Sequence, residues 1–303
     1  MDSEIVILGG GGFIGRHLAD GLAAQGLRVV VATRRPAHFP HPGIRNVVSP
    51  FENPDDFMPL LSTSGVVIHA ASSSTPGSSD ARPQIDGNLR TTLSLIEGLQ
   101  VHPGCRLLYL SSGGTLYGDS DAMVDEGTAI RPRSYHGAGK AAAEHFIHAW
   151  ASQYAGTAIV LRPSNVYGPG QHPRHGFGIV PAAFSCVREA RALEIWGDGE
   201  TVRDYLFVQD LVALCLLCLR SDPGVGVHVY NASSGRGVSL NALLEQIELV
   251  SGRELRRTHK AERRVDVRRV VPDNQAAGKA FGWAPQVGLI DGLNRFWQWF
   301  QTQ

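Results

Sequence analysis

Short runs of branched apolar residues recur along this chain of 303 residues, and they constrain its fold more than any other feature. Six such runs read "EIVIL", "RVVVA", "GVVIHA", "RLLYLS", "AIVLR" and "VHVYN", and segments of helical length lie between them. Runs that are apolar on both faces are typical of parallel strands covered by helices on both sides. The sequence therefore predicts an α/β fold built on a doubly wound parallel sheet.

Four of the intervening segments are predicted to be helices. Apolar residues recur at helical spacing over residues 13–24, 84–99, 135–154 and 210–220. With 43% hydrophobic residues, the chain can bury one large core or the cores of two domains in close contact. A loop rich in Pro, Gly and His, residues 167–178, leads into the second part of the chain.

Glycines stand at a regular spacing where the first predicted strand meets the first predicted helix. In "VILGGGGFIGRHL", Gly9, Gly12 and Gly15 have the spacing G-x-x-G-x-x-G. Glycines there allow a tight turn, let the backbone approach a pyrophosphate and let the helix pack on the sheet. The turn therefore predicts a dinucleotide-binding, Rossmann-like domain.

The end of the second predicted strand indicates which dinucleotide binds. It reads Thr33-Arg34-Arg35 and holds no acid that would accept a hydrogen bond from the ribose 2′-hydroxyl of NAD. Two guanidinium groups instead suit a 2′-phosphate, through charge-assisted bidentate hydrogen bonds. We therefore predict NADP(H) as the cofactor, with NAD as the alternative; a solvated basic loop is the other interpretation of the two arginines.

Bulk charge and hydropathy exclude several kinds of partner. Acidic and basic residues balance at 28 each, so no overall basic field favours nucleic acid or an anionic membrane. The longest apolar run, residues 211–219, is far shorter than the roughly 20 residues of a membrane-spanning helix. The N-terminal residues lack the features of a secretory signal. We expect a cytoplasmic protein that binds neither nucleic acid nor membrane.

Motifs along nearly the whole chain resemble one family. "GGGGFIG" is followed by "VIHAAS" (67–72), "LSSGGTLYG" (110–118), "LRPSNVYGPGQ" (161–171) and "GDGETVRDYLFVQDLV" (197–212). Together they resemble the extended short-chain dehydrogenase/reductase family, in particular nucleotide-sugar epimerases and dehydratases of the UDP-galactose 4-epimerase type. The resemblance implies a dinucleotide-binding domain and a smaller α/β lobe for a nucleotide sugar. The expected boundaries are 1–163 and 204–232 for the domain, and 164–203 and 233–303 for the lobe.

The resemblance also implies which residues contact the cofactor. They come from the glycine turn, the two strand ends that follow it and the active-site segments. The expected set is Gly9, Gly12, Phe13, Ile14, Gly15, Thr33, Arg34, Arg35, Ala70, Ala71, Lys140 and Pro163.

The expected catalytic helix departs from the family pattern. The resemblance implies a tyrosine four residues before a lysine, which lowers the pKa of the phenol so that it removes a proton from a sugar hydroxyl. In "PRSYHGAGKAAAE", the flanking residues fix the register around Lys140 and put His136 at the tyrosine position. An imidazole is a base at neutral pH without help, and Lys140 should favour its neutral form.

Two other interpretations of this helix stay open. His136 is a degenerate or substrate-binding residue, or the register is wrong and Tyr135 is active. A shift of one residue along a helix turns a side chain by about 100°, which argues against Tyr135.

The hydroxyl of the active-site strand is also altered. Counting back from Tyr117 puts Gly113 where the resemblance implies a serine or threonine. Successive strand residues face opposite ways, so Ser112 replaces the missing hydroxyl only if the chain is already turning. Thr115 restores the parity, and we rank it slightly above Ser112. The resemblance implies that dehydratases have an Asp-Glu pair where this chain has Gly114 and Thr115, so a dehydratase is disfavoured.

The residues that the resemblance assigns to substrate binding include two arginines. By resemblance, Asn165, Arg203 and Arg263 face the diphosphate of a nucleotide sugar, which calls for guanidinium and amide donors. The histidines His145, His172 and His175 lack a spacing typical of metal ligands, and we predict no metal site.

These features predict an NADP(H)-dependent nucleotide-sugar oxidoreductase that acts as an epimerase or as a keto-sugar reductase. Reduction needs only a proton donor, whereas epimerisation needs a base that works in both directions, so the histidine favours the reductase. The alternative is a non-enzymatic NADP-sensing regulator with a degenerate site. By analogy with the family we expect a homodimer paired through residues 84–100 and 135–153, although their apolar residues equally suit packing within one chain.

Overall fold

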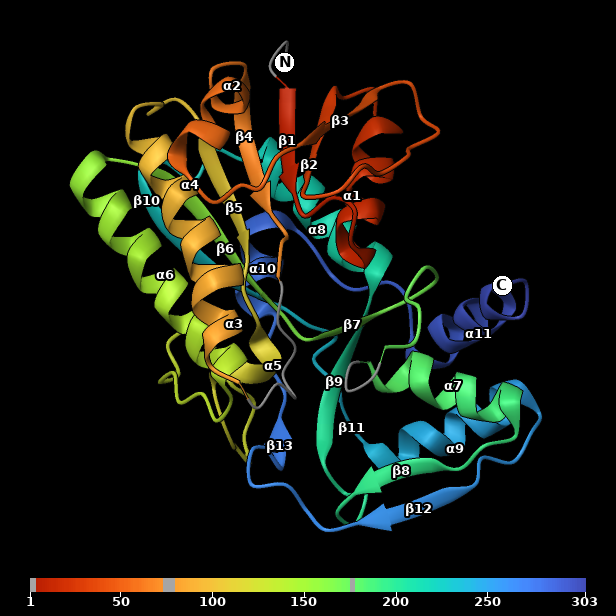
Figure 1. Ribbon diagram of the computed structural model, residues 1–303. Coiled ribbons are helices and arrows are strands. Elements are labelled where there is room, and N and C mark those ends of the chain that lie inside the picture. Colours follow the sequence, from red (N-terminus) through yellow and green to blue (C-terminus); the bar gives the residue numbers. More distant parts are fainter. Residues whose placement is uncertain (1–3, 73–79, 175–177) are drawn as a thin grey trace.

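The computed structural model describes residues 4–72, 80–174 and 178–303. Within these residues, one parallel sheet has the strand order β10-β6-β5-β4-β1-β2-β3 (Figure 1). Its strands are β1 Glu4–Leu8, β2 Val29–Thr33, β3 Ile44–Val48, β4 Ser64–His69, β5 Arg106–Leu110, β6 Thr157–Pro163 and β10 Gly226–Ala232. The predicted doubly wound α/β fold is confirmed.

Helices cover both faces of this sheet (Figure 1). One face carries α1 Phe13–Ala23, α8 Val208–Arg220 and α10 Gln275–Phe281. The other carries α2 Met58–Leu61, α4 Arg90–Gln100 and α6 Tyr135–Tyr154. This arrangement explains why the strands read as continuous apolar runs, because alternate residues enter different cores. In β1, Ile5 and Ile7 pack under the first face, and Val6 and Leu8 under the second.

A smaller lobe follows the sheet on the side of its carboxyl ends (Figure 1). It contains strands β7 Asn165–Tyr167, β8 Leu193–Trp196, β9 Val202–Phe207, β11 Gly237–Ser239, β12 Arg257–Lys260 and β13 Arg269–Val270. Three helices pack there, namely α7 Ile179–Glu189, α9 Leu240–Ser251 and α11 Leu289–Phe300. Phe184 stacks on Phe296 and Trp297 at ring-centroid distances of 5.3 and 5.1 Å. The lobe therefore has a core of its own.

One strand of the parallel sheet and one predicted helix differ from the sequence-based expectation. β3 was not predicted, because "IRNVV" is a half-exposed edge strand without a continuous apolar run. Helix 84–99 is interrupted: α3 Arg82–Gln84 runs into a π-helical turn, η2 Ile85–Leu89, before α4. There Thr92 Oγ1 donates to the carbonyl of Asn88 at 2.9 Å and competes for a helical acceptor.

Two short elements complete the described chain, the 3₁₀ turn η1 Pro54–Asp56 and helix α5 Gly113–Leu116. No helix among the described residues combines the length and the apolarity that crossing a bilayer requires. Cys215 and Cys218 are buried in the core beneath α8. His175 lies outside the described residues.

Candidate active site

The glycine turn after β1 is shaped by close backbone contacts. Gly9 has a φ of +83°, and a Cβ there would lie 2.6 Å from the Cα of Ala71, two residues beyond the end of β4. A Cβ on Gly15 would overlap the carbonyl oxygen of Gly9. Both positions therefore require glycine, and the backbone N–H groups at the start of α1 are left accessible to a ligand. This cradle fits a dinucleotide pyrophosphate.

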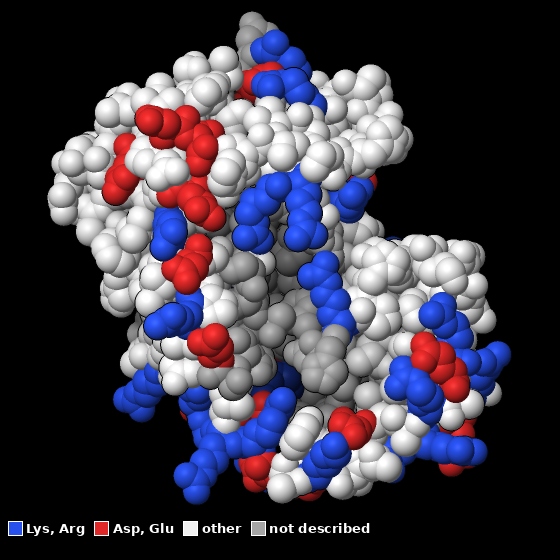
Figure 2. Space-filling view, in the orientation of Figure 1, with Lys and Arg blue, Asp and Glu red and all other residues white. Residues whose placement is uncertain are grey.

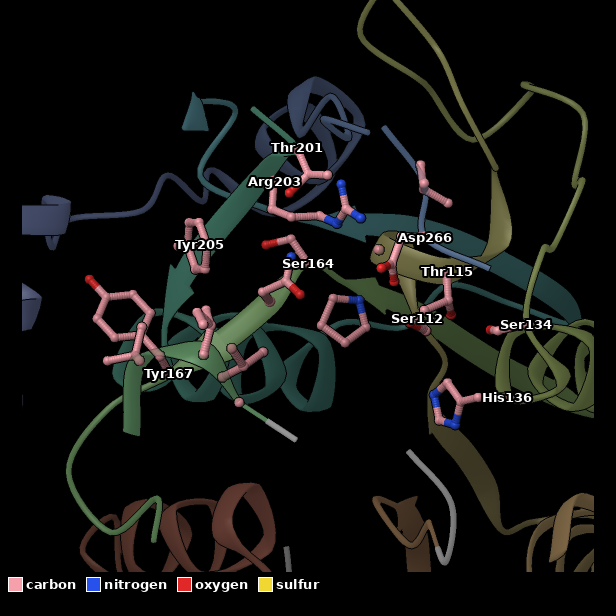
Figure 3. Close-up of a pocket in the computed structure, with 18 of the residues that line it drawn as sticks. Ser112, Thr115, Ser134, His136, Ser164, Tyr167, Thr201, Arg203, Tyr205 and Asp266 are labelled. Atoms are coloured by element: carbon pink, nitrogen blue, oxygen red, sulfur yellow. Dashed lines mark hydrogen bonds between the residues drawn. The ribbon is translucent and has the colours of Figure 1, made fainter. Parts of the chain in front are cut away.

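A cavity of about 440 Å³ lies at the carboxyl ends of the strands and continues into the smaller lobe. Eleven of the residues predicted from the sequence line it: Phe13, Ile14, Ala70, Ser112, Thr115, His136, Lys140, Pro163, Asn165, Arg203 and Arg263. The close-up shows Ser112, Thr115, Ser134 and His136 on one side of the cavity and Arg203 on another (Figure 3). Residues separated by up to 250 positions in the chain thus share one space.

The remaining predicted cofactor residues lie beside the cavity instead of lining it. They belong to the glycine turn, to the end of β2 and to the end of β4, at the same sheet edge. These residues are Gly9, Gly12, Gly15, Thr33, Arg34, Arg35 and Ala71. Arg34 and Arg35 are exposed, whereas Thr33 is buried.

His136 is buried at the first turn of α6 and faces the cavity, with 8% of its surface exposed. Burial lowers its pKa to about 4, and the charge of Lys140 acts in the same direction. The imidazole is therefore neutral at physiological pH. The predicted direction of this shift is confirmed, although burial contributes more than the lysine.

Lys140 lies one turn further along α6, with 5% of its surface exposed. Its Nζ donates to the carbonyl oxygen of Leu110 at 2.7 Å and lies 4.7 Å from the ring centroid of Tyr109. Burial lowers its pKa to about 8, against the opposing charge of Glu144. Lys140 is therefore mostly cationic at neutral pH, but it can release a proton near that pH.

Tyr135 does not enter the cavity. Its side chain is 51% exposed at the start of α6, and it is not among the described residues that line the space. The alternative register with Tyr135 as the base is therefore wrong, for the reason of helical geometry given above.

The hydroxyl groups near His136 come from the turn between β5 and α5. The strand ends at Leu110 and Ser112 stands at the N-cap of α5, so the chain has already turned when it reaches Ser112. A Cβ on Gly113 would lie 2.7 Å from the carbonyl oxygen of Arg162, so Gly113 faces the backbone of β6 and not the cavity. Thr115 Oγ1 donates to Ser112 Oγ at 2.7 Å. Both hydroxyls face the same cavity as a linked pair.

The predicted substrate residues lie toward the smaller lobe. Asn165 is exposed to the cavity, and its Nδ2 donates to the carbonyl of Asp204 at 2.9 Å. Burial lowers the pKa of Arg203, whose Nη1 donates to its neighbouring carbonyl, Val202, at 2.9 Å. Arg263 is paired bidentately with Asp266 at 2.8 and 2.9 Å and lies over the Trp196 ring at 5.2 Å. Its charge is therefore partly neutralised within the chain.

Sequence reasoning missed several residues of the cavity. Gln171 is 5% exposed and lines the space, and its Oε1 has no hydrogen-bond partner among the described residues. Trp196 and Asp266 also line it, together with Tyr167 and Tyr205. Tyr167 and Gln171 belong to the family-like segment "LRPSNVYGPGQ", and Asp266 follows Arg263 by three residues, but neither pattern indicated that these side chains would enter the cavity.

Positive charge gathers along the hollow between the two lobes. Figure 2 shows Lys and Arg side chains on both sides of that hollow, whereas acidic side chains collect mainly on the outer surfaces. Among the residues that the structure describes, four cationic ones line the cavity itself, against two acidic ones: Arg133, Lys140, Arg203 and Arg263, and Glu194 and Asp266. The field inside the hollow therefore favours an anionic ligand, despite the zero net charge of the chain.

The cavity starts at a glycine turn of this kind and continues into a second lobe. α/β proteins with such a cavity form a class that binds a dinucleotide beside a second ligand. The sequence model of the NAD dependent epimerase/dehydratase family matches residues 5–233. The chain belongs to this family, within the extended short-chain dehydrogenases/reductases.

Individual relatives align over almost the whole chain. UDP-glucose 4-epimerase of Mycolicibacterium smegmatis is 29% identical and covers 98% of each chain. The dTDP-4-dehydro-6-deoxyglucose reductase of Escherichia coli is 26% identical and covers 96% of this chain and 95% of the relative. The crystal structure of UDP-glucose 4-epimerase of Thermus thermophilus with NAD superimposes with a TM-score of 0.89 at 27% identity, covering 98% and 99% of the two chains.

Proposed function

We propose that this protein is an NADPH-dependent reductase of a keto sugar linked to a nucleotide. The supporting observation is His136, a neutral imidazole in the cavity at the position where the family resemblance implies a tyrosine base. The similarity to a keto-sugar reductase of nearly equal length agrees with this proposal.

The chemistry of the cavity favours reduction over hydroxyl deprotonation. A base whose conjugate acid has a pKa of about 4 is too weak to remove a proton from a sugar hydroxyl efficiently. Reduction instead requires a group that stabilises negative charge on the carbonyl oxygen and then protonates it. Lys140, a buried cation with a pKa of about 8, has both properties. A bound nicotinamide cofactor would supply the hydride.

Ser112 is the best candidate for the hydrogen bond to the carbonyl oxygen. Thr115 already donates its hydroxyl proton to Ser112 Oγ, so the hydroxyl of Ser112 is the one that can donate to a ligand. We therefore place Ser112 above Thr115 as the contact, with Thr115 orienting it. Asn165, Arg203 and Arg263 would bind the diphosphate, since all three line the cavity on the side of the smaller lobe.

The same residues allow two competing functions. Several relatives are named epimerases, so epimerisation is the second candidate, with His136 accepting and returning the hydroxyl proton. The NADP-sensing regulator is the third. Asn165, Arg203 and Arg263 argue against it, because a protein that only senses a dinucleotide gains nothing from a lined second cavity.

One set of measurements separates these functions. Thermal shifts with NADPH, NADH and a panel of UDP-, GDP- and dTDP-sugars report which ligands bind. Incubation of NADPH with the matching 4-keto sugars should then consume one equivalent of NADPH for each reduced sugar. Interconversion of two sugars without net oxidation of cofactor would favour the epimerase, and a cofactor response without any sugar response would favour the sensor.

A variant sharpens this test. Ser112→Ala should lower kcat for reduction by roughly tenfold or more, because a preorganised donor to the developing charge is lost. Ser120→Ala is a matched control, since Ser120 is not among the residues that line the cavity and, in the described part of the chain, its hydroxyl donates to the carbonyl of Ala122. Equal activity of Ser112→Ala and the unaltered protein would contradict the assigned contact.

We further propose that the dinucleotide and the nucleotide sugar bind to the two parts of the chain with the predicted boundaries. We also propose that the protein acts as a homodimer in the cytoplasm. Residues 1–163 and 204–232 would hold the dinucleotide, and 164–203 and 233–303 the nucleotide sugar. The dimer would pair α4 and α6. Ile96 packs inside the chain, but Ile85 and Phe146 are 57% and 47% exposed and are available for such a contact.

A further inference from the structure

The loop that follows β2 carries two neighbouring arginines, Arg34 and Arg35. Within the described residues, the side chains of Arg34 and Arg35 form no hydrogen bond and no ion pair, and both are exposed. An arginine has nearly 2 kcal/mol of rotamer entropy to lose on binding, and a mobile backbone would add to that cost. The ability of this loop to select a phosphate therefore depends on how firmly its backbone is held.

Asn46, on the edge strand β3, holds that backbone. Its Oδ1 accepts a hydrogen bond from the N–H of Ala37 at 2.9 Å. Its Nδ2 donates to the carbonyl of Val31 at 2.9 Å and to Thr33 Oγ1 at 2.8 Å. Both N–H groups of the amide thus donate hydrogen bonds, and the side chain connects the end of β2 to Ala37, which follows the two arginines.

The hydroxyl of Thr33 links Asn46 to the backbone of the arginine pair. Its hydroxyl accepts from Asn46 and donates to the carbonyl of Arg35 at 2.7 Å. Arg34 therefore lies between two residues whose backbone is fixed by one short chain of hydrogen bonds. Thr33 is 9% exposed, so solvent competes weakly for these bonds.

The same loop lies against the glycine turn. A Cβ on Gly11 would be 3.2 Å from Thr33 Cγ2 and 3.8 Å from the Cβ of Ala37. On the other side, Arg16 of α1 donates to the carbonyls of Gly11 and His38 at 3.3 and 3.2 Å. The loop is thus clamped between β3 and α1, and a change at Asn46 would move the arginines relative to the bound dinucleotide.

We propose that Asn46 is a positioning residue that sets the preference for a 2′-phosphorylated dinucleotide by preorganising Arg34 and Arg35. This inference rests on the proposed use of NADP(H). Asn46 touches no phosphate itself. Its three hydrogen bonds reduce the conformational freedom that the two guanidinium groups lose when they bind the phosphate.

The test compares the affinities of the full-length protein for NADPH and NADH by calorimetric titration. Asn46→Ala should weaken NADPH binding by about tenfold, since a preorganised pair of charged hydrogen bonds is loosened, and NADH binding by less than about twofold. Val48→Ala, an exposed neighbour on β3, should change neither affinity.

A thermodynamic cycle separates positioning from general damage. In the background Arg34→Ala/Arg35→Ala, the further change Asn46→Ala should no longer alter the ratio of NADPH to NADH affinity. Equal losses of both cofactors in Asn46→Ala, or the same loss in the arginine-free background, would overturn the positioning role. If Arg34→Ala/Arg35→Ala alone leaves the ratio unchanged, the proposed NADP(H) preference fails as well, and this outcome is distinct from a failure of Asn46 alone.

Discussion

Three ionisable side chains beneath the sheet edge share one electrostatic environment. Burial, helped by the charge of Lys140, lowers the pKa of His69 to about 3 and that of His136 to about 4. His69 packs edge-on against Tyr109 at 5.2 Å, and Lys140 lies over the same ring. Lys140, a buried cation, and His136, a neutral imidazole, both line the cavity, and the charge of Lys140 would suit the developing alkoxide of the proposed reduction.

The pH dependence of reduction should report Lys140 and not His136. Lys140 is cationic below its pKa of about 8, so kcat/KM should be level between roughly pH 5.5 and 7 and should fall as the pH rises through 8. His136 gains a proton only near pH 4 and contributes no step in that range.

A rate profile on stable enzyme, with the substrate carrying no titrating group in this range, tests the assignment. An inflection near pH 6.5 that disappears in His136→Asn would show an imidazole of ordinary basicity, which would contradict the weak base on which the proposed reductase rests.

At the residue scale, the sequence predicted the place of His136 but not the roles of the hydroxyls. The i, i+4 spacing to Lys140 fixes a helical face from sequence alone. Ser112 was expected to replace the missing hydroxyl only if the chain already turned there, and the chain does turn into α5 at Ser112, so that both Ser112 and Thr115 line the cavity. Where a strand ends depends on the packing of Gly113 against β6, which is a tertiary contact.

The beginning of α6 depends on small residues. Ser134 caps the helix by accepting a hydrogen bond from the N–H of Gly137 at 3.1 Å. A Cβ on Gly137 would overlap the carbonyl oxygen of Thr115, and one on Gly139 would lie 3.2 Å from Gln84 Oε1. "SYHGAGK" therefore lets α6 pack closely on α5 and α3, and this close packing brings His136 next to the hydroxyl pair.

Gly137→Ala should destabilise the protein despite the higher helix propensity of alanine. The methyl group must displace backbone of α5, and overpacking of this kind costs about 1–3 kcal/mol of unfolding free energy. Urea unfolding measures the change, and Thr115 should be displaced enough to lower kcat as well.

Gly104→Ala is the matched control. A Cβ there meets no atom within 4 Å and the backbone φ is not positive, so this variant should be unchanged or up to about 1 kcal/mol more stable. A neutral Gly137→Ala would mean that α6 can shift outward freely, contrary to the packing described here.

A buried ion pair ties the same helix to the sheet. Glu144 accepts from Ser111 and pairs with Arg162 of β6 at 2.6 Å, with both charged side chains almost fully buried. Arg162 Nη1 in turn donates to Tyr117 at 2.9 Å. Removal of one partner from such a pair typically lowers the free energy of unfolding by several kcal/mol. Because the network joins α6 to β6, it also holds the angle at which α6 meets the strand ends.

The cavity between the two lobes is formed by segments from both halves of the chain. The chain leaves the parallel sheet after β6, returns to it at β10 and ends in the smaller lobe, so the cavity is bounded by segments from both halves (Figure 1). Ligands that bind there would contact both lobes at once. Cofactor and substrate binding should therefore each stabilise the molecule as a unit.

The proposed homodimer gives a test at this scale. Phe146→Glu on the exposed face of α6 should convert the dimer to a monomer, because a charge would be buried in an apolar interface. Sedimentation velocity measures the assembly. Leu249→Glu, on α9 and 73% exposed in the smaller lobe, should leave it unchanged. A monomeric unaltered protein, or a dimer that survives Phe146→Glu, would contradict the pairing through α4 and α6.

The sequence by itself determined the parallel sheet, the glycine turn and the helical face shared by His136 and Lys140. Each of these follows from short-range periodicity or from the steric freedom of glycine, and both are properties of neighbouring residues. Only the tertiary structure decided the burial that keeps His136 neutral, the turn that presents Ser112 and the amide of Asn46 beside the arginine loop. These depend on atoms brought together from distant segments, and desolvation and hydrogen bonding act through distances in space that no local pattern encodes.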